Sequence, residues 1–189
     1  MREALDGEVS DDAQIAAARC AQVEIDRAGP RAPALQPVCA AGCSYCCHVH
    51  AEVTRPELLA LVAHLREAWT PEATSALRER LVRQVARVGG MSDAERWAAR
   101  IPCALLDDAG GCSIHVARPL RCRAFHSCSV EPCREAFEGR GEAAPVKSPL
   151  LARAQDAAEE GYDRALIAAG LTATGERLES GLLALLDRP

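Results

Sequence analysis

Apolar residues recur at helical spacing along most of the chain. Between residues 15 and 28, 58 and 65, 77 and 88, and 150 and 169, they fall three or four positions apart. Positions spaced in this way share one face of an α-helix, and that face can be buried against another helix. The pattern therefore predicts a mainly α fold in which helices pack on helices. A further short helix is expected from about residue 175 to residue 186.

Polar residues that commonly begin helices stand directly before several of these segments. Ser10 is followed by two aspartates, and Thr54 and Ser92 each precede a glutamate by three positions. These are the spacings of an N-cap and of capping boxes, in which side chains satisfy the free backbone groups of the first turn. A Gly-Pro pair ends the first segment, and three prolines in residues 30–38 predict an extended connector.

Residues 103–115 depart from the helical pattern. A short apolar run after Cys103 leads into the acidic, glycine-rich residues 107–111, and Cys112 begins a second short run. This arrangement predicts a β-hairpin. The expected fold is a small helical domain wrapped around a cysteine-rich metal-binding centre, with one short β-hairpin. We expect a single domain over residues 1–189, with an N-terminal helix and connector (1–38), a cysteine-cluster core (39–137) and C-terminal helices (138–189).

Composition and charge narrow the classes of function. Aromatic residues make up only 3% of the chain, and the net charge is -5 with acids and bases interspersed. No basic stripe suggests a nucleic-acid partner. No apolar run reaches the roughly 20 residues that a membrane-spanning helix needs. The polar N-terminus has no signal-peptide pattern, so we expect a cytoplasmic protein.

Ten cysteines are unusual for a protein in a reducing compartment, where thiols stay free of disulfides. Cys20 stands alone in a helical pattern and is expected to pack as a small apolar residue. The others cluster, which indicates metal or redox chemistry. Thiolates favour zinc, iron–sulfur clusters and Cu(I). We therefore expect an iron–sulfur or zinc centre with these ligands: Cys39, Cys43, Cys46, Cys47, Cys103, Cys112, Cys122 and, closing the set, Cys133.

The number of metal ions is left open by the spacing. Adjacent side chains such as Cys46 and Cys47 point in different directions, so they could serve two metals or one multinuclear site. The spacing from Cys39 through Cys43 to Cys46 also occurs in radical SAM enzymes. Those enzymes have a large barrel of alternating strands and helices, which this pattern does not predict.

Other residues near the cysteines could assist the centre. Arg118 and Arg123, with Arg121 between them, could offset the negative charge of a thiolate site and donate hydrogen bonds to sulfur. His115 and His126 could ligate through imidazole, and one further cysteine, Cys128, could add a thiolate. The other histidines are expected to be packing or surface residues.

These motifs together resemble the CxxCxxCC cysteine-cluster family, described as a zinc- or iron-chelating domain. The resemblance covers roughly residues 39–137 and rests on Cys39-x3-Cys43-x2-Cys46-Cys47, on Cys103-Ala-Leu-Leu before an acidic glycine turn, and on Cys112-Ser-Ile-His115-x2-Arg118-Pro119-x2-Cys122-Arg123. It implies eight metal-binding cysteines, the set given above. Members usually have tyrosine where His115 stands, so His115 either replaces a packing ring or adds a ligand. Some members are labelled iron–sulfur oxidoreductases.

Three functions are compatible with this pattern. The first is a metal-binding protein whose centre is structural or regulatory or serves metal handling, with metal ions and a protein as partners. The second is an iron–sulfur redox enzyme or electron carrier. The third is a thiol redox sensor that uses Cys46 and Cys47 or Cys128, because adjacent cysteines form strained, labile disulfides. No nucleophile–base pair, phosphate loop or dinucleotide motif indicates another enzyme class.

Overall fold

Helices form most of the computed structural model, which describes residues 9–28, 36–40, 42–140 and 144–188. The α-helices are α1 (Asp11–Ala28), α2 (Arg55–Ala68), α3 (Pro71–Val88), α4 (Asp93–Ala98), α5 (Leu120–Ala124), α6 (Val130–Phe137), α7 (Pro149–Ala168) and α8 (Leu178–Leu186). Two short 3₁₀ helices, η2 (Tyr45–His48) and η3 (His115–Ala117), and two strands, β1 (Glu52–Val53) and β2 (Glu176–Arg177), complete the regular elements. The prediction of a mainly α fold is confirmed.

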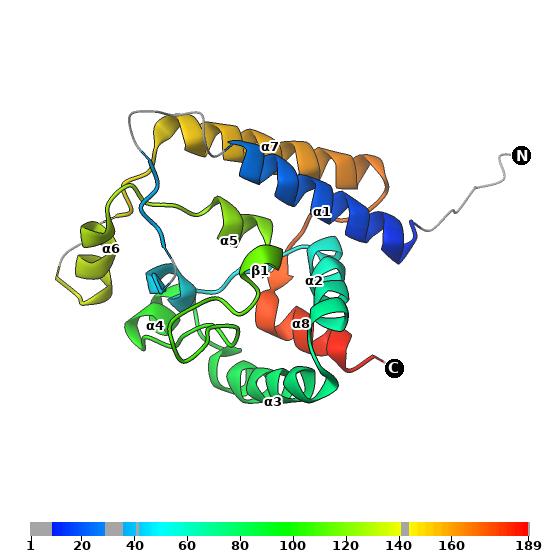
Figure 1. Cartoon of the computed structure of the whole chain (residues 1–189), viewed down its shortest axis with the longest axis horizontal. Coiled ribbons are helices and arrows are strands. Elements are labelled where there is room, and N and C mark those ends of the chain that lie inside the picture. The colour runs from blue at the N-terminus through cyan, green and yellow to red at the C-terminus, as the bar shows by residue number, and fades with distance from the viewer. Residues whose placement is uncertain (1–8, 29–35, 41, 141–143, 189) are drawn as a thin grey trace, which may run out of the picture.

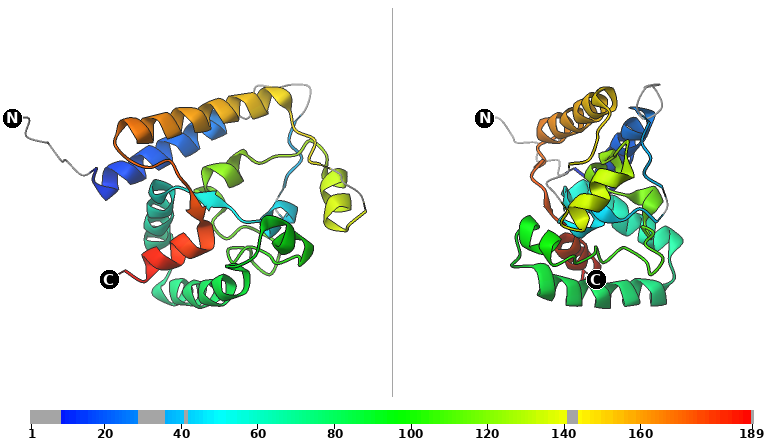
Figure 2. Two further views of the ribbon diagram at one scale, coloured as in Figure 1. Left: turned by 180° about the vertical axis from the view of Figure 1, so that it is seen from behind. Right: turned by 90° about the vertical axis from the view of Figure 1, so that its left-hand side faces the viewer.

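The helices form two groups that enclose the cysteine-bearing segments. Figure 1 shows α1 and α7 side by side on one side of the molecule, with α2, α3 and α8 on the opposite side. Helix α1 packs against both α7 and α2, and α8 packs against α2 and α3. In Figure 2 the same arrangement is seen from behind, and α6 stands apart at the end where α4 and η2 lie.

Two clusters of buried apolar residues hold these groups together. The larger joins α2, α3 and α8 through residues such as Leu61, Leu77 and Leu182, each at most 1% exposed. The smaller joins α1, α5 and α7 around Ile25 and Leu166. Burying one such leucine contributes about 1.5–3 kcal/mol relative to leaving it exposed. Cys103 and Cys112 pack against the larger cluster, so the thiol-bearing segments are built onto the main core.

The helix starts are those expected from the sequence. The Ser10 hydroxyl accepts a hydrogen bond from the backbone N–H of Ala13 at 3.3 Å. The backbone N–H groups of Thr54 and Ser92 donate to the carboxylates three positions later, at 2.8 and 2.7 Å. These bonds satisfy donors that the first helical turn leaves free. The predicted caps at these helices are therefore confirmed.

The β-structure lies in a different place from the predicted hairpin. Residues 103–115 form only an isolated antiparallel bridge between Leu106 and Cys112. The regular strands are β1 and β2, which pair in antiparallel register with Glu52 opposite Arg177. Asp107 explains the difference, because its carboxylate accepts hydrogen bonds from the N–H groups of Ala109 and Gly111 and closes a tight turn. The side-chain bonds replace ladder bonds that a longer hairpin would need.

Two further expectations are altered or lie outside the described residues. The last helix begins at Leu178 and not near residue 175, because residues 176–177 pair with β1. Residues 30–35 of the predicted connector, which spans residues 30–38, lie outside the described residues.

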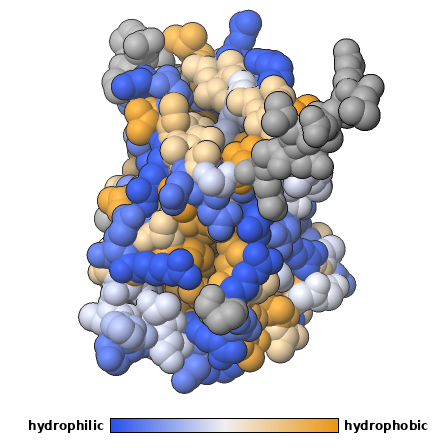
Figure 3. Space-filling view, turned by 90° about the vertical axis from the view of Figure 1, so that its right-hand side faces the viewer, coloured by the Kyte–Doolittle hydropathy of each residue, from blue (hydrophilic) through white to orange (hydrophobic). Residues whose placement is uncertain are grey.

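No helix in the described part of the chain is long and apolar enough to cross a membrane. Figure 3 views the side at the right of Figure 1 and shows hydrophilic residues around a hollowed apolar area.

Candidate metal centre

The 3₁₀ helix η2 lies at the middle of the thiol-bearing segments. The chain reaches it through two turns, in which the Cys43 N–H donates to the Ala40 carbonyl at 3.0 Å and the Cys47 N–H to the Ser44 carbonyl at 2.9 Å. Gly42 has a φ of 85°, a left-handed conformation that favours glycine. A 3₁₀ helix has three residues per turn, so the side chains of Cys46 and Cys47 leave it in different directions.

The 103–115 segment is fastened to one side of η2. The backbone N–H of Cys103 donates to the carbonyl of Cys47 at 2.7 Å. The bridge between Leu106 and Cys112 then returns the chain towards the same place. Two cysteines that are far from Cys47 in sequence therefore become its neighbours.

Cys122 arrives from helix α5. The N–H of Leu120, at the start of α5, donates to the Glu57 carboxylate on α2 at 2.8 Å. Burial is the main cause that raises the pKa of Cys122 to about 12, and the nearby Cys46 and Cys112 raise it further. Because these electrostatic effects require proximity, α5 brings Cys122 to the same group of thiols.

Cys39 and Cys133 are held by other parts of the chain, namely the residues around Ser127 and helix α6. The N–H of Ser127 donates to the Cys39 sulfur at 3.3 Å. Helix α6, which carries Cys133, packs against η2. The ring of Phe137 at the end of α6 lies 5.5 Å from the ring of Tyr45 and 4.6 Å from that of His48, centroid to centroid.

The electrostatic effects between thiols divide them into two neighbourhoods. Burial raises the pKa of Cys43, and the nearby Cys39, Cys46 and Cys133 raise it as well. We call these four residues the outer thiols. Burial also raises the pKa values of Cys103 and Cys112. The inner thiols are Cys47, Cys103, Cys112 and Cys122: Cys103 and Cys112 are electrostatic neighbours of Cys47, and Cys122 is a neighbour of Cys103. Cys46, an outer thiol, also acts on Cys112 and Cys122.

Cys46 and Cys47 join the two neighbourhoods. The Cys47 thiol donates a hydrogen bond to the Cys46 sulfur, which lowers the pKa of Cys46 to about 7 and raises that of Cys47. The guanidinium of Arg118 lowers the pKa of Cys46 further. The Cys46 sulfur therefore forms the thiolate, the form that binds metal, more readily than an ordinary cysteine does.

The thiols are free of disulfides, but their sulfur atoms are not arranged around a common point. All ten cysteines are outside disulfides. In the part of the chain that the structure describes, no three His, Cys, Asp or Glu side chains are arranged closely enough to hold a metal ion. The donor chemistry nevertheless fits zinc and iron–sulfur clusters, which are commonly held by four thiolates. Binding therefore requires side chains that are already neighbours to turn towards a common point.

The candidate arginines occupy different positions. Arg118 is half-buried and lowers the pKa values of both Cys46 and Cys112, so its charge acts on the thiols. Arg123 forms an ion pair with Asp26 at 2.7 Å and donates to the Val116 carbonyl. Arg118 is thus placed to offset thiolate charge, whereas the described contacts of Arg123 join α5 to α1, to η3 and to the backbone of Arg118.

The other candidate ligands have separate surroundings. Both ring nitrogens of His126 have partners: the Ser148 N–H donates to Nε2 and Nδ1 lies 3.1 Å from the Ala124 carbonyl oxygen. His115 is exposed, and the charge of Arg118 is the first cause that lowers its pKa. Cys128 is half-buried, with its N–H bonded to the Val146 carbonyl. Cys20 is exposed on α1, in contrast to the expectation of a packed thiol.

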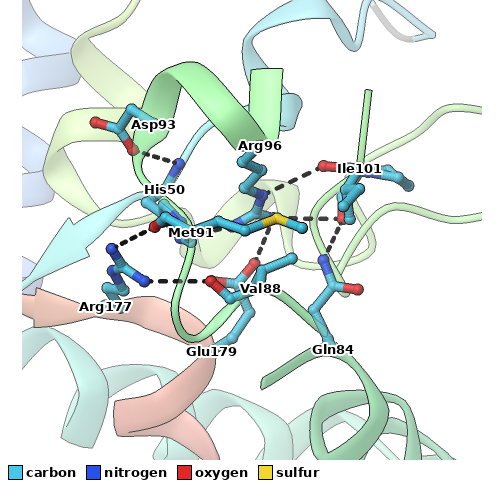
Figure 4. A network of polar contacts seen from close by, with 10 residues as sticks. His50, Gln84, Val88, Met91, Asp93, Arg96, Ile101, Arg177 and Glu179 are labelled. Atoms are coloured by element: carbon cyan, nitrogen blue, oxygen red, sulfur yellow. Dashed lines mark hydrogen bonds and ion pairs between the residues drawn. The ribbon is translucent and has the colours of Figure 1, made fainter. Parts of the chain in front are cut away.

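A buried arginine supports the centre, and sequence reasoning missed it. The Arg96 side chain is fully buried in α4. Its guanidinium donates to the carbonyls of Ile101 and Pro102, both at 3.3 Å, and pairs with Glu179 of α8 at 2.7 Å (Figure 4). Because Cys103 directly follows Pro102, these bonds fix the chain that leads into an inner thiol.

The same network reaches the chain that leaves η2. Arg96 Nη1 lies 3.0 Å from Nδ1 of His50, and Nε2 of His50 lies 3.1 Å from the Met91 carbonyl oxygen (Figure 4). An arginine is always a donor, so Nδ1 accepts and Nε2 carries the proton of a neutral ring. Burial and the charge of Arg96 accordingly lower the pKa of His50. The network thereby connects the segments after Cys47 and before Cys103.

Comparison with known proteins agrees with this site. The model of the family "CxxCxxCC: Putative zinc- or iron-chelating domain" matches residues 38–144, more than half of the chain. The chain belongs to this family, and metal chelation is the property that the family describes. No curated protein and no solved structure matches the chain.

Proposed function

We propose that this protein holds a zinc or iron–sulfur centre through eight cysteines and that the centre serves a structural or regulatory role or metal handling. The ligands would be the outer and inner thiols together. The observation that carries this proposal is the gathering of free thiols from residues 39–47, 103–122 and 133 around η2. Free thiols that come together from segments so distant in sequence are the arrangement expected of ligands to a shared metal.

The charge balance supports the same assignment. Four thiolates around Zn²⁺, or around a [4Fe–4S]²⁺ cluster, leave a net charge of about -2. Arg118 acts on thiols of both neighbourhoods and would offset part of that charge. A bound metal would cross-link η2, the 103–115 segment and α5, so its binding energy would add to folding energy.

An iron–sulfur electron carrier or oxidoreductase is the second candidate. Cys39 and Cys46 are exposed, which would place a cluster near the surface and within reach of an electron partner. The spacing of Cys39, Cys43 and Cys46 is also one that iron–sulfur clusters use.

Metal analysis and a visible spectrum of anaerobically purified protein test both candidates. Metal binding predicts near-stoichiometric zinc or iron, and protein with neither metal after reconstitution would contradict it. An iron–sulfur centre predicts absorption near about 400 nm that bleaches with dithionite. Colourless protein with stoichiometric zinc would eliminate the electron carrier.

Metal affinity should rise with pH. The thiols with raised pKa values, including Cys103 and Cys122, are protonated at neutral pH, so each must lose a proton when it binds metal. Zinc binding in weakly buffered solution should therefore release several protons, and competition with a chelator should show weaker binding at about pH 6 than at about pH 8. Affinity that is independent of pH would show that thiols are not the ligands.

A further inference from the structure

We propose that the eight thiols form two separate four-thiolate sites, and that the outer site exchanges its divalent metal ion with external chelating ligands while the inner site retains its ion. This inference rests on the metal-binding function proposed above. It assigns Cys39, Cys43, Cys46 and Cys133 to the outer site and Cys47, Cys103, Cys112 and Cys122 to the inner site.

The backbone around η2 supports the division. The carbonyl of Cys47 is bonded to the N–H of Cys103, which commits Cys47 to the side of the 103–115 segment. Helix α6 meets η2 through Phe137 and the rings of Tyr45 and His48. Cys133, on α6, therefore approaches η2 at a contact made by rings, not at the hydrogen bond that places Cys103.

The inner thiols belong to the folded core. Cys103 and Cys112 pack against the larger apolar cluster, and the neighbouring Leu105 and Ile114 are each 1% exposed. Buried Arg96 holds the two carbonyls before Cys103. Close-packed interiors resist the displacement of a side chain or of the backbone that carries it. An inner cysteine therefore cannot move away from a bound ion without disturbing the packing of the core.

The outer thiols are carried by more loosely attached parts of the chain. Cys39 and Cys46 are exposed. Helix α6 contains no buried residue, and Figures 1 and 2 show it at the margin of the molecule. Segments with few buried apolar contacts open more readily than core helices. The Cys133 ligand can therefore leave and return at lower cost than Cys103 or Cys112.

This difference determines how an ion can leave. In a ligand exchange, an incoming chelator atom binds the ion while one cysteine thiolate departs and takes up a proton from water. The ion stays divalent, and no oxidant or reductant is consumed. The two exposed cysteines of the outer site admit the incoming ligand, whereas all four inner thiols are half-buried, and Cys103 and Cys112 are held against the core. The outer site would thus serve metal transfer and the inner site would serve stability.

Release of zinc to a coloured chelator tests the proposal. Reduced full-length protein is loaded with zinc, freed of excess metal, and mixed with 4-(2-pyridylazo)resorcinol. We expect two equivalents bound and two phases of equal amplitude, the first at least about tenfold faster, a barrier difference of about 1.4 kcal/mol. Cys133→Ser should remove the fast equivalent and leave the slow phase within about twofold, since serine is a poor zinc ligand at neutral pH.

Serine variants of other cysteines serve as controls for the effect of Cys133→Ser on zinc release. Cys39→Ser should repeat the effect of Cys133→Ser from a different segment, which guards against local misfolding of α6. Cys128→Ser and Cys20→Ser should leave both phases unchanged. Release of both ions in one phase, binding of a single equivalent, or loss of the slow equivalent in the Cys39 variant would overturn the two-site proposal. Protein that binds no zinc and also takes up no iron on reconstitution would overturn the proposed function itself.

Discussion

Arg96→Met should lower the free energy of unfolding by about 3–5 kcal/mol, the usual cost of removing one partner from a buried ion pair. The Glu179 carboxylate, 2.7 Å from the guanidinium and equally buried, would lose its counter-charge. The carbonyls of Ile101 and Pro102 would lose a donor as well. Urea unfolding of the metal-loaded protein, followed by circular dichroism, measures the change.

The exposed pair Arg78–Asp187 provides the matched control. It has a similar short contact, but both side chains are more than two-fifths exposed. Arg78→Met should therefore cost about 1 kcal/mol or less. If Arg96→Met were as mild as Arg78→Met, the buried network would not be a main contributor to the stability of the fold. The double variant with Glu179→Leu should recover part of the loss, since no unpaired charge then remains.

Cys112→Ser should remove the inner metal ion and destabilise the protein by several kcal/mol. The side chain packs against the core, and a hydroxyl at that place is both a weaker ligand and a buried polar group. Metal content by mass spectrometry and thermal unfolding followed by circular dichroism give the two readouts.

Cys128→Ser is the control for a half-buried cysteine outside the ligand set. It should change neither metal content nor unfolding by more than about 0.5–1 kcal/mol. A Cys112→Ser protein that keeps both equivalents and its wild-type midpoint would remove Cys112 from the ligands.

Local signals explain which parts of the fold could be predicted. The starts of α1, α2 and α4 follow from Ser10, Thr54 and Ser92, because a cap and its partner lie within four residues of each other. The clustering of the cysteines is also visible in the sequence itself. It predicts metal binding, and this agrees with the description of the family. Membership of each thiol in the ligand set stays a prediction.

Features that depend on distant contacts could not be predicted. The pairing of β1 with β2 joins residues more than 120 positions apart and has two residues on each side, too short to leave a pattern. Arg96 follows a capping box in a charged helix, where an arginine is normally solvated. The Arg96 guanidinium can be buried because the Glu179 carboxylate of α8 pairs with it. This pairing cannot be read from the sequence around Arg96. The sequence predicts a small hairpin over residues 103–115, where the structure has an isolated bridge. The hydrogen bonds of the Asp107 carboxylate in the turn leave no signal in a pattern of apolar and polar residues.

The order of the thiols along the chain has a consequence for biosynthesis. Both groups take members from η2 or the residues before it, yet neither can be completed until the chain has grown about 75 residues further, to Cys122 and then Cys133. At the ribosome's pace of about 5–20 residues per second, that interval is about 4–15 s. Throughout it, four unligated thiols within nine residues would stand on the nascent chain, accessible to any metal donor or oxidant that reaches them first.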